Sequence, residues 1–428
     1  MRVWLINPYG PIRGEGWRDY RFVMLGDALA RAGHDCVWWT SNFSHHFKRF
    51  RSAAWADIQV RDGFVIRLVP TTGYKSNVSA GRVLRDAVFA WRTYRRGRVL
   101  DPPDCVFYSE SPLCLGFAGQ KLAAHHGVPV VFDQMDLWPE LFEPVFPKWS
   151  RALVRLALAP IYESRRRVYE RLDAVVSLAG SYLEVPLREA PALQNRPHGV
   201  FYNGIDVVLF RALMNGTSVG GDPWPAKGEK DVWAVFAGSL GVSYDIGALI
   251  EAARRTATGA PNLRIIVAGD GPLRPDVEAY AGRSGSNLSY TAALRTEDLC
   301  RLYRQCDIGL CTYSARSNVE MPDKFYDYTA AGLAVINSLP GDVRRVIQER
   351  GLGLQYRAGD GEDLANALAS LVSDAQARRR MAHSAFEVGM TYDRHVQYGA
   401  LVQFLVSLCG GEARREPGAN AYPHDGRS

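Results

Sequence analysis

Short apolar runs alternate along the chain with longer stretches whose apolar residues recur at helical spacing. In the first half the pattern predicts a helix over 18–32 and strands at residues 3–6, 36–40, 66–69, 104–108, 129–132 and 174–177. Strands that alternate with helices in this way favour a parallel sheet covered on both faces, the doubly wound α/β class.

The alternation stops near the middle of the chain and then starts again. Residues 215–230 are rich in Gly, Pro and polar residues, which is typical of a linker or surface loop. Beyond them the pattern predicts a helix over 246–255 and strands at 232–237, 263–268, 307–310 and 333–336. We therefore expect two α/β domains, followed by a disordered tail over 410–428, where apolar periodicity is lost.

Composition excludes several classes of protein. Of the 428 residues, 47% are hydrophobic and 22% charged, an ordinary globular balance that argues against a disordered chain, a collagen or a coiled coil. No apolar run reaches the roughly 18 residues of a membrane-spanning helix, and no signal-peptide pattern precedes Val3. The seven cysteines include no Cys-x-x-Cys pair. We expect a cytoplasmic protein with reduced thiols, without a disulfide framework or a zinc site.

Positive charge is concentrated in one stretch. The chain carries +6 overall, whereas residues 48–98 hold twelve lysines and arginines against three aspartates, which is +9. Such a stretch attracts anionic partners, namely phospholipid headgroups, nucleic acid or a phosphorylated substrate, although a solvated arginine-rich surface is the simpler interpretation.

Glycine-rich turns follow predicted strands in both halves. Gly14 and Gly16, with Arg13 beside them, follow the first strand and precede a helix whose free N–H groups could face an anion. Their spacing is not that of a dinucleotide fingerprint, and a simple tight turn is the alternative. In the second half, Gly238 and Ser239 follow one strand, and Gly269 and Gly271 follow the next.

A third segment of the second half combines charge with a helix start. Pro322 stands where the first turn of a helix tolerates proline, so the N–H groups near Met321 and Asp323, together with Lys324, could cradle a diphosphate. Asp327 lies three residues after Lys324 on the same helix face, where it could accept hydrogen bonds from both ribose hydroxyls. A surface ion pair on an ordinary helix is the alternative.

Together these segments resemble the retaining glycosyltransferases of family four. The resemblance rests on residues 322–336 (Pro-Asp-Lys-Phe-Tyr-Asp-Tyr-Thr-Ala-Ala-Gly-Leu-Ala-Val-Ile), on Asp136–Glu140, on Tyr202–Asp206 and on Ala268–Pro272, and it spans about residues 1–395 in the expected order. The segment Asp136–Glu140 (Asp-Leu-Trp-Pro-Glu) resembles a motif of one subgroup of this family, whose members transfer amino or deoxy sugars to O-antigen and capsule intermediates.

The resemblance implies the GT-B fold, with two facing Rossmann-like domains and a nucleotide sugar in the cleft. We expect an acceptor-side domain over 1–210, a donor domain over 211–395 and a helix over 396–409 that crosses back to the first domain. The donor is expected at Arg13, Gly14, Gly16, Gly238, Ser239, Gly269, Gly271, Met321, Asp323, Lys324 and Asp327.

Two departures from the family pattern bear on chemistry. Many members carry an Arg and a Lys that neutralise the diphosphate, where this chain has Ser239 and Tyr244. The place of the first Glu of the family's E-x7-E pair falls on Val319, with Glu320 one residue away. Positive charge must then come from Lys324, helix N-termini, Arg13 or Arg316.

The expected mechanism uses neither a metal nor a cofactor. The chain has no Asp-x-Asp motif, and the nearest mimic, Asp360 with Glu362, is predicted to cap a helix. The resemblance implies retention by same-face attack, with the leaving phosphate as base. Lys324, Glu110 and Asp136 are the candidate catalytic residues, although Asp136 could equally be an N-cap.

The expected partners are a nucleotide-diphosphate sugar, UDP by preference, and a polyprenyl-diphosphate-linked or other glycan acceptor. Residues 82–98 and 146–159 combine Trp or Phe with arginines at helical spacing, which favours peripheral contact with the inner face of an anionic plasma membrane; packing on their own domain is the alternative. No nucleic-acid-binding module is present. A UDP-sugar 2-epimerase and a non-catalytic nucleotide- or glycan-binding homologue remain alternatives.

Overall fold

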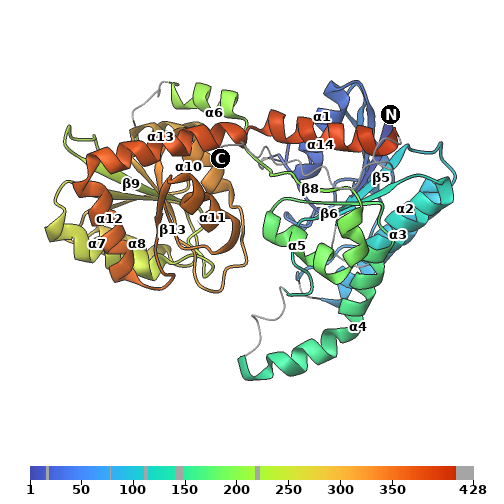
Figure 1. Ribbon diagram of the computed structural model, residues 1–428, viewed down its shortest axis with the longest axis horizontal. Coiled ribbons are helices and arrows are strands. Elements are labelled where there is room, and N and C mark those ends of the chain that lie inside the picture. Colours follow the sequence, from blue (N-terminus) through green and yellow to red (C-terminus); the bar gives the residue numbers. More distant parts are fainter. Residues whose placement is uncertain (16–18, 78, 110–113, 141–147, 217–221, 411–428) are drawn as a thin grey trace. The chain divides into compact units, whose positions relative to one another are not determined.

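The chain forms two compact α/β units, which the computed structural model describes over residues 1–15, 19–77, 79–109, 114–140, 148–216 and 222–410. Unit 1 comprises Met1–Tyr202 and the chain from Tyr398 onward, and unit 2 comprises Asn203–Gln397 (Figure 1). The chain leaves unit 1 at Tyr202, earlier than the expected residue 210, and returns to it at Tyr398. The predicted tail over 410–428 lies outside the described residues except for Gly410.

Unit 1 is built on an eight-stranded sheet in the order β3-β4-β2-β1-β5-β6-β7-β8. All neighbouring strands are parallel except the edge strand β3, which pairs antiparallel with β4. The strands are β1 (Arg2–Ile6), β2 (Asp35–Ser41), β3 (Ala56–Arg61), β4 (Phe64–Val69), β5 (Cys105–Ser109), β6 (Val130–Gln134), β7 (Ala174–Ser177) and β8 (His198–Val200).

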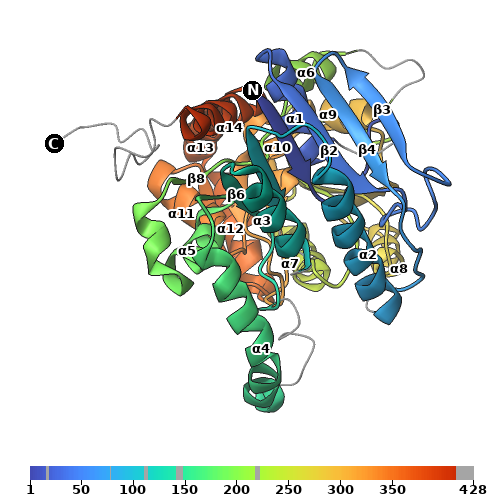
Figure 2. The same ribbon diagram turned by 90° about the vertical axis from the view of Figure 1, so that its right-hand side faces the viewer.

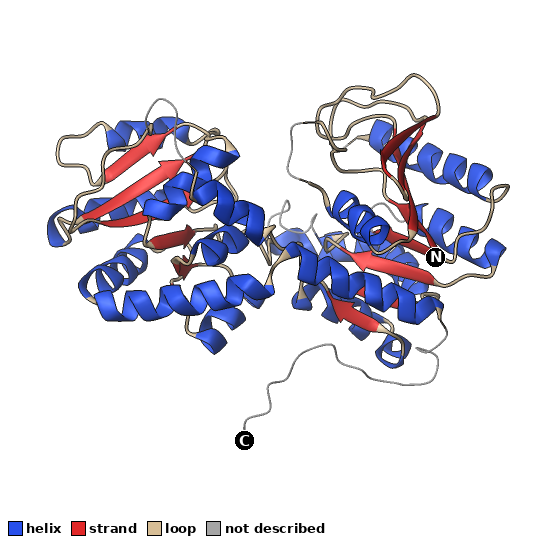
Figure 3. Cartoon of the chain, turned by 90° about the horizontal axis from the view of Figure 1, so that it is seen from above, coloured by secondary structure: helices blue, strands red, loops and turns tan. Residues whose placement is uncertain are grey.

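Helices cover both faces of this sheet (Figures 2 and 3). Phe22 and Leu25 of α1 and Leu401 and Leu405 of α14 belong to one buried cluster with the sheet residue Leu5. The opposite face is packed by the helices α2, α3, α4 and α5, through residues such as Phe89, Leu122, Tyr169 and Leu183. The helices of unit 1 are α1 (Arg21–Arg31), α2 (Ala80–Gly97), α3 (Cys114–His126), α4 (Arg151–Glu170), α5 (Gly180–Glu189) and α14 (Arg394–Cys409), the last of which enters the unit at Tyr398.

Unit 2 contains a six-stranded, fully parallel sheet in the order β11-β10-β9-β12-β13-β14. Leu249 of α7, Val277 of α8 and Leu368 of α12 pack on one face. The strands are β9 (Val232–Ala237), β10 (Leu263–Ala268), β11 (Leu288–Thr291), β12 (Ile308–Cys311), β13 (Ala334–Asn337) and β14 (Gly353–Gln355). The helices are α6 (Val207–Met214), α7 (Ile246–Gly259), α8 (Arg274–Ala281), α9 (Thr296–Gln305), α10 (Asp323–Ala331), α11 (Gly341–Arg350), α12 (Gly361–Ser373) and α13 (Ala375–Thr391).

Every strand predicted from apolar periodicity is present. The first helix begins at Arg21, however, and not at residue 18, since Tyr20 is still extended with φ −83° and ψ 152°. Asp360 caps α12 by accepting from the N–H groups of Glu362 and Asp363, as its sequence context predicted. The strands β3, β8, β11 and β14 escaped prediction because they are short or half exposed and lack a continuous apolar run.

A buried ion pair joins the start of α1 to the end of β6 in unit 1. Nε and Nη2 of Arg21 donate to the two carboxylate oxygens of Asp133 at 2.6 and 3.0 Å, and Nη1 donates to the carbonyl oxygen of Phe201 at 2.7 Å. Both charged side chains are at most 1% exposed. The pair therefore fixes the helix start against the carboxyl edge of the sheet.

We expect Asp133→Ala to lower the free energy of unfolding by about 3–5 kcal/mol, because it leaves the Arg21 guanidinium buried without a counter-charge. Denaturant unfolding of the full chain measures the loss. The double variant Arg21→Met/Asp133→Leu should regain most of it, since an apolar pair removes the uncompensated charge. Equal losses in the single and double variants would contradict this account.

Candidate functional site

Two glycine-lined loops of unit 2 follow the carboxyl ends of β9 and β10, the edge at which α/β sheets bind ligands. Gly238 and Gly269 have φ values of +147° and +156°, which favour glycine. A Cβ on Gly269 would lie 1.8 Å from the carbonyl oxygen of Gly238, and one on Gly271 would lie 2.7 Å from that of Leu240. The two loops therefore pack backbone against backbone, and this contact by itself requires the glycines.

The N-terminus of α10 opens at the end of the loop that follows β12. Pro322 is the N-cap residue, and its side chain offers no acceptor to the first N–H groups of the helix. A helix start of this kind presents free donors and a positive dipole end to an anion. Of the residues predicted here, Met321 is buried at 6% exposure and Asp323 is exposed.

Lys324 lies in the first turn of α10, buried in an aromatic cage. It is 6% exposed, and its Nζ makes no hydrogen bond to any residue that the structure describes. The ammonium lies 4.0 Å from the ring centroid of Phe236, 4.1 Å from that of Tyr244 and 5.0 Å from that of Tyr313. A Cβ on Gly238 would come within 3.1 Å of Nζ, so the glycine gives the ammonium access to the backbone of the loop after β9.

Burial lowers the pKa of Lys324 to about 7, and the nearby Asp327 offsets this only in part. Cation–π contacts stabilise the ammonium less than a salt bridge or bulk water would. A group of this kind, held beside an uncapped helix start and without a partner, is poised to receive an anionic ligand.

Tyr244, one of the two positions where the family that the sequence resembles carries a basic residue, packs against Tyr313. They form an isolated antiparallel bridge between the loops after β9 and β12, with ring centroids 4.8 Å apart. Ser239, the other substituted position, is exposed. The aromatic cage was not anticipated because Tyr313 is distant in sequence from Phe236 and Tyr244, and the sheet order places the loops after β9 and β12 side by side.

Asp327 lies one turn beyond Lys324 and is only 2% exposed. Its Oδ2 accepts a hydrogen bond from the Tyr303 hydroxyl at 3.4 Å. Glu320, one residue from the expected position of the other acidic group, accepts from the N–H of Asp342 at 3.3 Å and thus serves the start of α11.

The donor residues predicted in the first half lie in unit 1. Arg13 is ion-paired with Asp27 of α1, so its charge is already compensated within the unit. Gly14 has φ +88° and open space at its Cβ position, which is typical of a turn. Gly16 and the candidate catalytic residue Glu110 lie outside the described residues.

Asp136 follows β6 at the carboxyl edge of the unit 1 sheet. Asp136 is exposed to solvent on one side. The surrounding protein nevertheless desolvates its carboxyl and raises the pKa to about 6, while the positive charge of Arg82 lowers this pKa. The carboxylate remains mostly ionised at pH 7 and can accept a hydrogen bond from a hydroxyl group.

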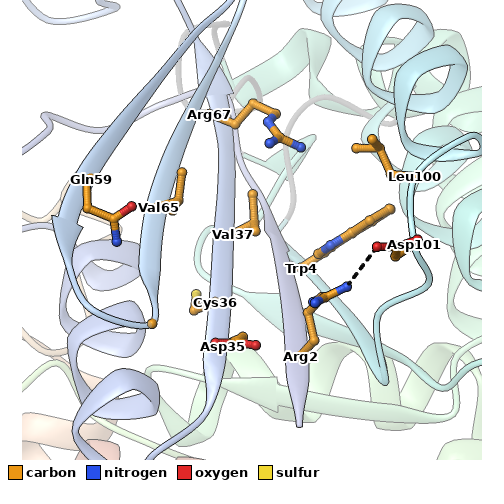
Figure 4. A pocket seen from close by; sticks show the side chains of 11 residues that line it. Arg2, Trp4, Asp35, Cys36, Val37, Gln59, Val65, Arg67, Leu100 and Asp101 are labelled. Carbon is orange, nitrogen blue, oxygen red and sulfur yellow. Dashed lines mark ion pairs between the residues drawn. The ribbon is translucent and has the colours of Figure 1, made fainter.

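A cavity of about 410 Å³ lies elsewhere on unit 1 (Figure 4). Trp4, Val37 and Arg67 line it, and Arg2 pairs across it with Asp101 at 3.9 Å. It is placed at the amino ends of β1, β2 and β4, opposite the edge that carries Asp136. We therefore do not assign it to the candidate site.

Two further features concern metals and thiols. Among the described residues, no group of three or more His, Cys, Asp or Glu side chains lies where it could hold a metal ion. The cysteines whose surroundings the structure describes are free thiols, and Cys36, Cys105, Cys300, Cys306 and Cys311 are buried.

Comparisons with known proteins agree with this architecture. Residues 232–374, which form most of unit 2, match the family described as glycosyl transferases group 1. The sulfoquinovosyl transferase SQD2 of Arabidopsis thaliana is 24% identical over 319 residues; the match covers 71% of this chain and 58% of the length of the plant protein.

Solved structures share the fold of the chain. A trehalose-6-phosphate protein from E. coli, bound with UDP-2-fluoro glucose, superposes with a TM-score of 0.67 at 13% identity, covering 98% of this chain and 100% of that one. WaaG, a glycosyltransferase involved in lipopolysaccharide biosynthesis, gives 0.59 at 16% identity, covering 94% and 99%. The fold is therefore GT-B, and with the match over unit 2 it supports a group 1 glycosyltransferase.

We expect Lys324→Met to stabilise the protein, by up to about 4 kcal/mol at or below pH 7, because it removes a buried charge. The folded-state pKa of about 7 lies below the ordinary 10.5, so the destabilisation is complete below pH 7. It shrinks as the pH rises from 7 towards 10.5, where the folded protein loses the proton first. Melting temperatures of variant and wild type should therefore converge over this range.

Lys227→Met is the matched control, since Lys227 is ion-paired with Asp307 at 2.7 Å and is partly exposed. It should leave the melting temperature unchanged or lower it. A lower melting temperature for Lys324→Met at pH 7 would contradict the assignment of Lys324 as an uncompensated buried cation.

Proposed function

We propose that the protein transfers a sugar from a nucleotide-diphosphate sugar, UDP by preference, to a lipid-linked or other glycan acceptor during the synthesis of a surface polysaccharide or glycolipid. A polyprenyl-diphosphate-linked acceptor is the preferred candidate. Transfer retains the anomeric configuration. The enzyme works in the cytoplasm, at the inner face of the plasma membrane.

The observation that carries this proposal is the unpartnered ammonium of Lys324 at the open start of α10, next to the glycine-lined loops of unit 2. A nucleotide-sugar diphosphate carries two negative charges and many acceptor oxygens, so it matches both the helix N–H groups and the buried cation. Gly238, which has no side chain, allows the Lys324 ammonium to lie against the backbone of the loop after β9.

The relatives support the donor class. The E. coli structure holds a UDP sugar analogue, and SQD2 is named as a transferase of the sugar sulfoquinovose. The role of WaaG in lipopolysaccharide biosynthesis supports a surface glycan as the product. These properties belong to those proteins, and we extend them to this chain by proposal.

In the proposed mechanism, unit 2 stabilises the leaving group. As the glycosidic bond to the diphosphate breaks, negative charge develops on the departing phosphate oxygen, and Lys324 with the N–H groups of α10 stabilises it. The acceptor hydroxyl attacks from the same face and gives its proton to that oxygen. No protein nucleophile is needed, and Asp136, with Glu110, orients hydroxyl groups of the reacting sugars.

Protonation of Lys324 should accompany donor binding. With a pKa of about 7, a substantial fraction of the empty sites is neutral at physiological pH. A bound diphosphate favours the charged form and raises that pKa, so the protein takes up a proton when the donor arrives.

Two exposed apolar surfaces on unit 1 support the membrane part of the proposal. Leu153 and Leu156 in the first two turns of α4 are 64% and 72% exposed, and Trp149, in the 3₁₀ turn just before the helix, is 81% exposed. On α2, Leu84 and Trp91 are 55% and 50% exposed. Both helices cover the same face of the unit 1 sheet, and α4 extends beyond it (Figures 1 and 2).

These apolar residues are accompanied by cations. Arg155 of α4 is exposed, and the guanidinium of Arg95 lies 5.1 Å from the ring centroid of Trp91 on α2. Helices that lie in the surface of an anionic bilayer typically insert Trp and Leu side chains at the level of the headgroups and carry arginines beside them. Within the described residues, no helix has the length and hydropathy needed to cross a membrane.

We expect Asp327→Ala to weaken UDP binding by about tenfold or more, because a carboxylate hydrogen bond to the ribose hydroxyls is lost. Calorimetric titration of the full chain with UDP and with 2′,3′-dideoxy-UDP tests this directly. The dideoxy ligand should bind wild type and variant with equal affinity, since the hydroxyls are already absent. An equal loss with both ligands, or no loss with UDP, would contradict the ribose assignment.

We expect Leu153→Glu/Leu156→Glu to reduce binding to phosphatidylglycerol vesicles at least tenfold, because two exposed leucines, each contributing about 1.5–3 kcal/mol when buried, are replaced by anions. Cosedimentation measures the loss, and UDP binding should not change. Val208→Glu/Leu209→Glu, on the exposed surface of α6 in unit 2, is the matched control. Equal sedimentation of both double variants with vesicles would contradict the assignment of α4.

A further inference from the structure

A cluster of cationic side chains gathers at the carboxyl edge of the unit 1 sheet. Arg82 and Arg85 come from the first two turns of α2, while His45 and Lys48 come from the loop after β2. Tyr9 and Tyr74 hold the cluster together: the guanidinium of Arg85 lies 4.4 Å from the ring centroid of Tyr9 and 5.3 Å from that of Tyr74. We call these residues the α2 cation cluster.

One carboxylate, Asp86, faces the cluster from α2. Asp86 accepts a hydrogen bond from the Tyr9 hydroxyl at 2.7 Å and lies 3.0 Å from Nε of Arg85 and 3.9 Å from Nε of Arg82. Because Asp86 is 1% exposed and Arg85 is fully buried, this pair forms the inner part of the cluster. Among the described residues, Asp86 is the carboxylate ion-paired with these side chains, so the cations of the cluster outnumber the carboxylate that pairs with them.

The remaining contacts of the outer cations are neutral. Arg82 donates through Nε to the Tyr9 hydroxyl at 3.1 Å and through Nη1 to the carbonyl oxygen of Asn77 at 3.0 Å. Lys48 donates to the side-chain oxygen of Asn77, and its ammonium lies 4.5 Å from the ring centroid of Tyr74. Beyond the Asp86 contact of Arg82, neither side chain is ion-paired with any described residue.

The positive charges of the cluster affect the neighbouring side chain of His45. Burial, together with Lys48, Arg82 and Arg85, lowers the pKa of His45 to about 3, so this ring is neutral at physiological pH. His45 is half-buried, and its Nδ1 shares a hydrogen bond with the Tyr74 hydroxyl. A neutral imidazole beside uncompensated cations is available to contact an anion.

Lys48 also adopts an unusual backbone conformation. Its φ is +53°, the only positive value among the non-glycine residues that the structure describes. A side chain held in the left-handed region costs free energy, which surrounding contacts must supply, and such residues concentrate at ligand sites. The conformation here brings the Lys48 ammonium onto the ring of Tyr74.

The geometry points to an anion-binding site at the α2 cation cluster, where Arg82 and Lys48 hold a phosphoryl group of the acceptor. This inference rests on the proposed function and narrows its acceptor to a phosphate or diphosphate ester. Arg82 also acts electrostatically on Asp136, so the site lies close to the carboxylate proposed to orient the reacting hydroxyl. That proximity fits a diphosphate attached to the same sugar that accepts the transfer.

Titration of the full chain with inorganic pyrophosphate at physiological salt tests the site. The titration uses a Lys324→Met background, which disables the anion site of unit 2. Arg82→Gln and Lys48→Gln should each weaken pyrophosphate binding about tenfold, because each removes one charge-assisted contact. Arg95→Gln is the matched control, since Arg95 is exposed on the same helix and contacts only Trp91 among the described residues.

The outcome separates this site from general attraction and from the membrane surface. Equal losses in Arg82→Gln and Arg95→Gln, or no pyrophosphate binding to the Lys324→Met chain, would overturn the proposal. Unchanged binding of Arg82→Gln to phosphatidylglycerol vesicles would support a discrete phosphoryl site, whereas a loss there equal to the pyrophosphate loss would assign the cluster to lipid headgroups and overturn it.

Failure of the proposed function has a different signature. A wild-type chain that binds no nucleotide sugar, yet binds pyrophosphate in an Arg82-dependent manner, would refute the transferase and leave the anion site intact. A chain that binds the donor normally but shows no Arg82-dependent pyrophosphate binding would refute only the anion site.

Discussion

The candidate site of unit 2 depends on one ammonium group, that of Lys324, which is buried without a hydrogen-bond partner among the described residues. A lysine inside a protein is unfavourable unless something compensates its lost hydration. Around Lys324, aromatic faces and the electrostatic effects of Cys311 and Asp327 compensate the lost hydration only in part, and burial lowers the pKa to about 7. The backbone of Gly238 and the open start of α10 leave the ammonium accessible to an anion, so the binding of an anion relieves a strain that folding imposes.

In unit 1, by contrast, the buried cation Arg21 is compensated by a carboxylate. Its deepest pair, Arg21 with Asp133, is satisfied on every side and contributes to the fold, whereas the α2 cation cluster carries more positive than negative charge. The contrast separates structural from functional charge: a buried guanidinium with a bidentate partner fixes elements, and cations that share one carboxylate can still recruit a ligand. Both arrangements lie at the carboxyl edge of the sheet, where the strand ends leave space for loops.

The sequence predicted the architecture well because apolar periodicity reports which residues are buried. It also predicted the glycine loops that follow β9 and β10 and a helix that begins near Pro322 and carries Lys324. It could not show that Arg13 is neutralised by Asp27, nor that Asp327 turns inward to Tyr303, because both depend on contacts between distant segments. The aromatic cage escaped for the same reason: its three rings are separated by up to about eighty residues of sequence.

The aromatic cage gives a role to Tyr244, which, like Ser239, stands where the family that the sequence resembles commonly has a basic residue. Where several cations share a phosphate site, their mutual repulsion lowers each pKa and keeps the site ready for an anion. In this chain Tyr244 covers the Lys324 ammonium with an aromatic face, its ring centroid 4.1 Å from Nζ. Desolvation of Lys324, and not repulsion between neighbouring cations, therefore lowers its pKa and favours the binding of an anion. Because neutral Lys324 must gain a proton to bind a diphosphate, donor affinity in this chain should follow pH near neutrality, whereas a site of permanently charged arginines would not.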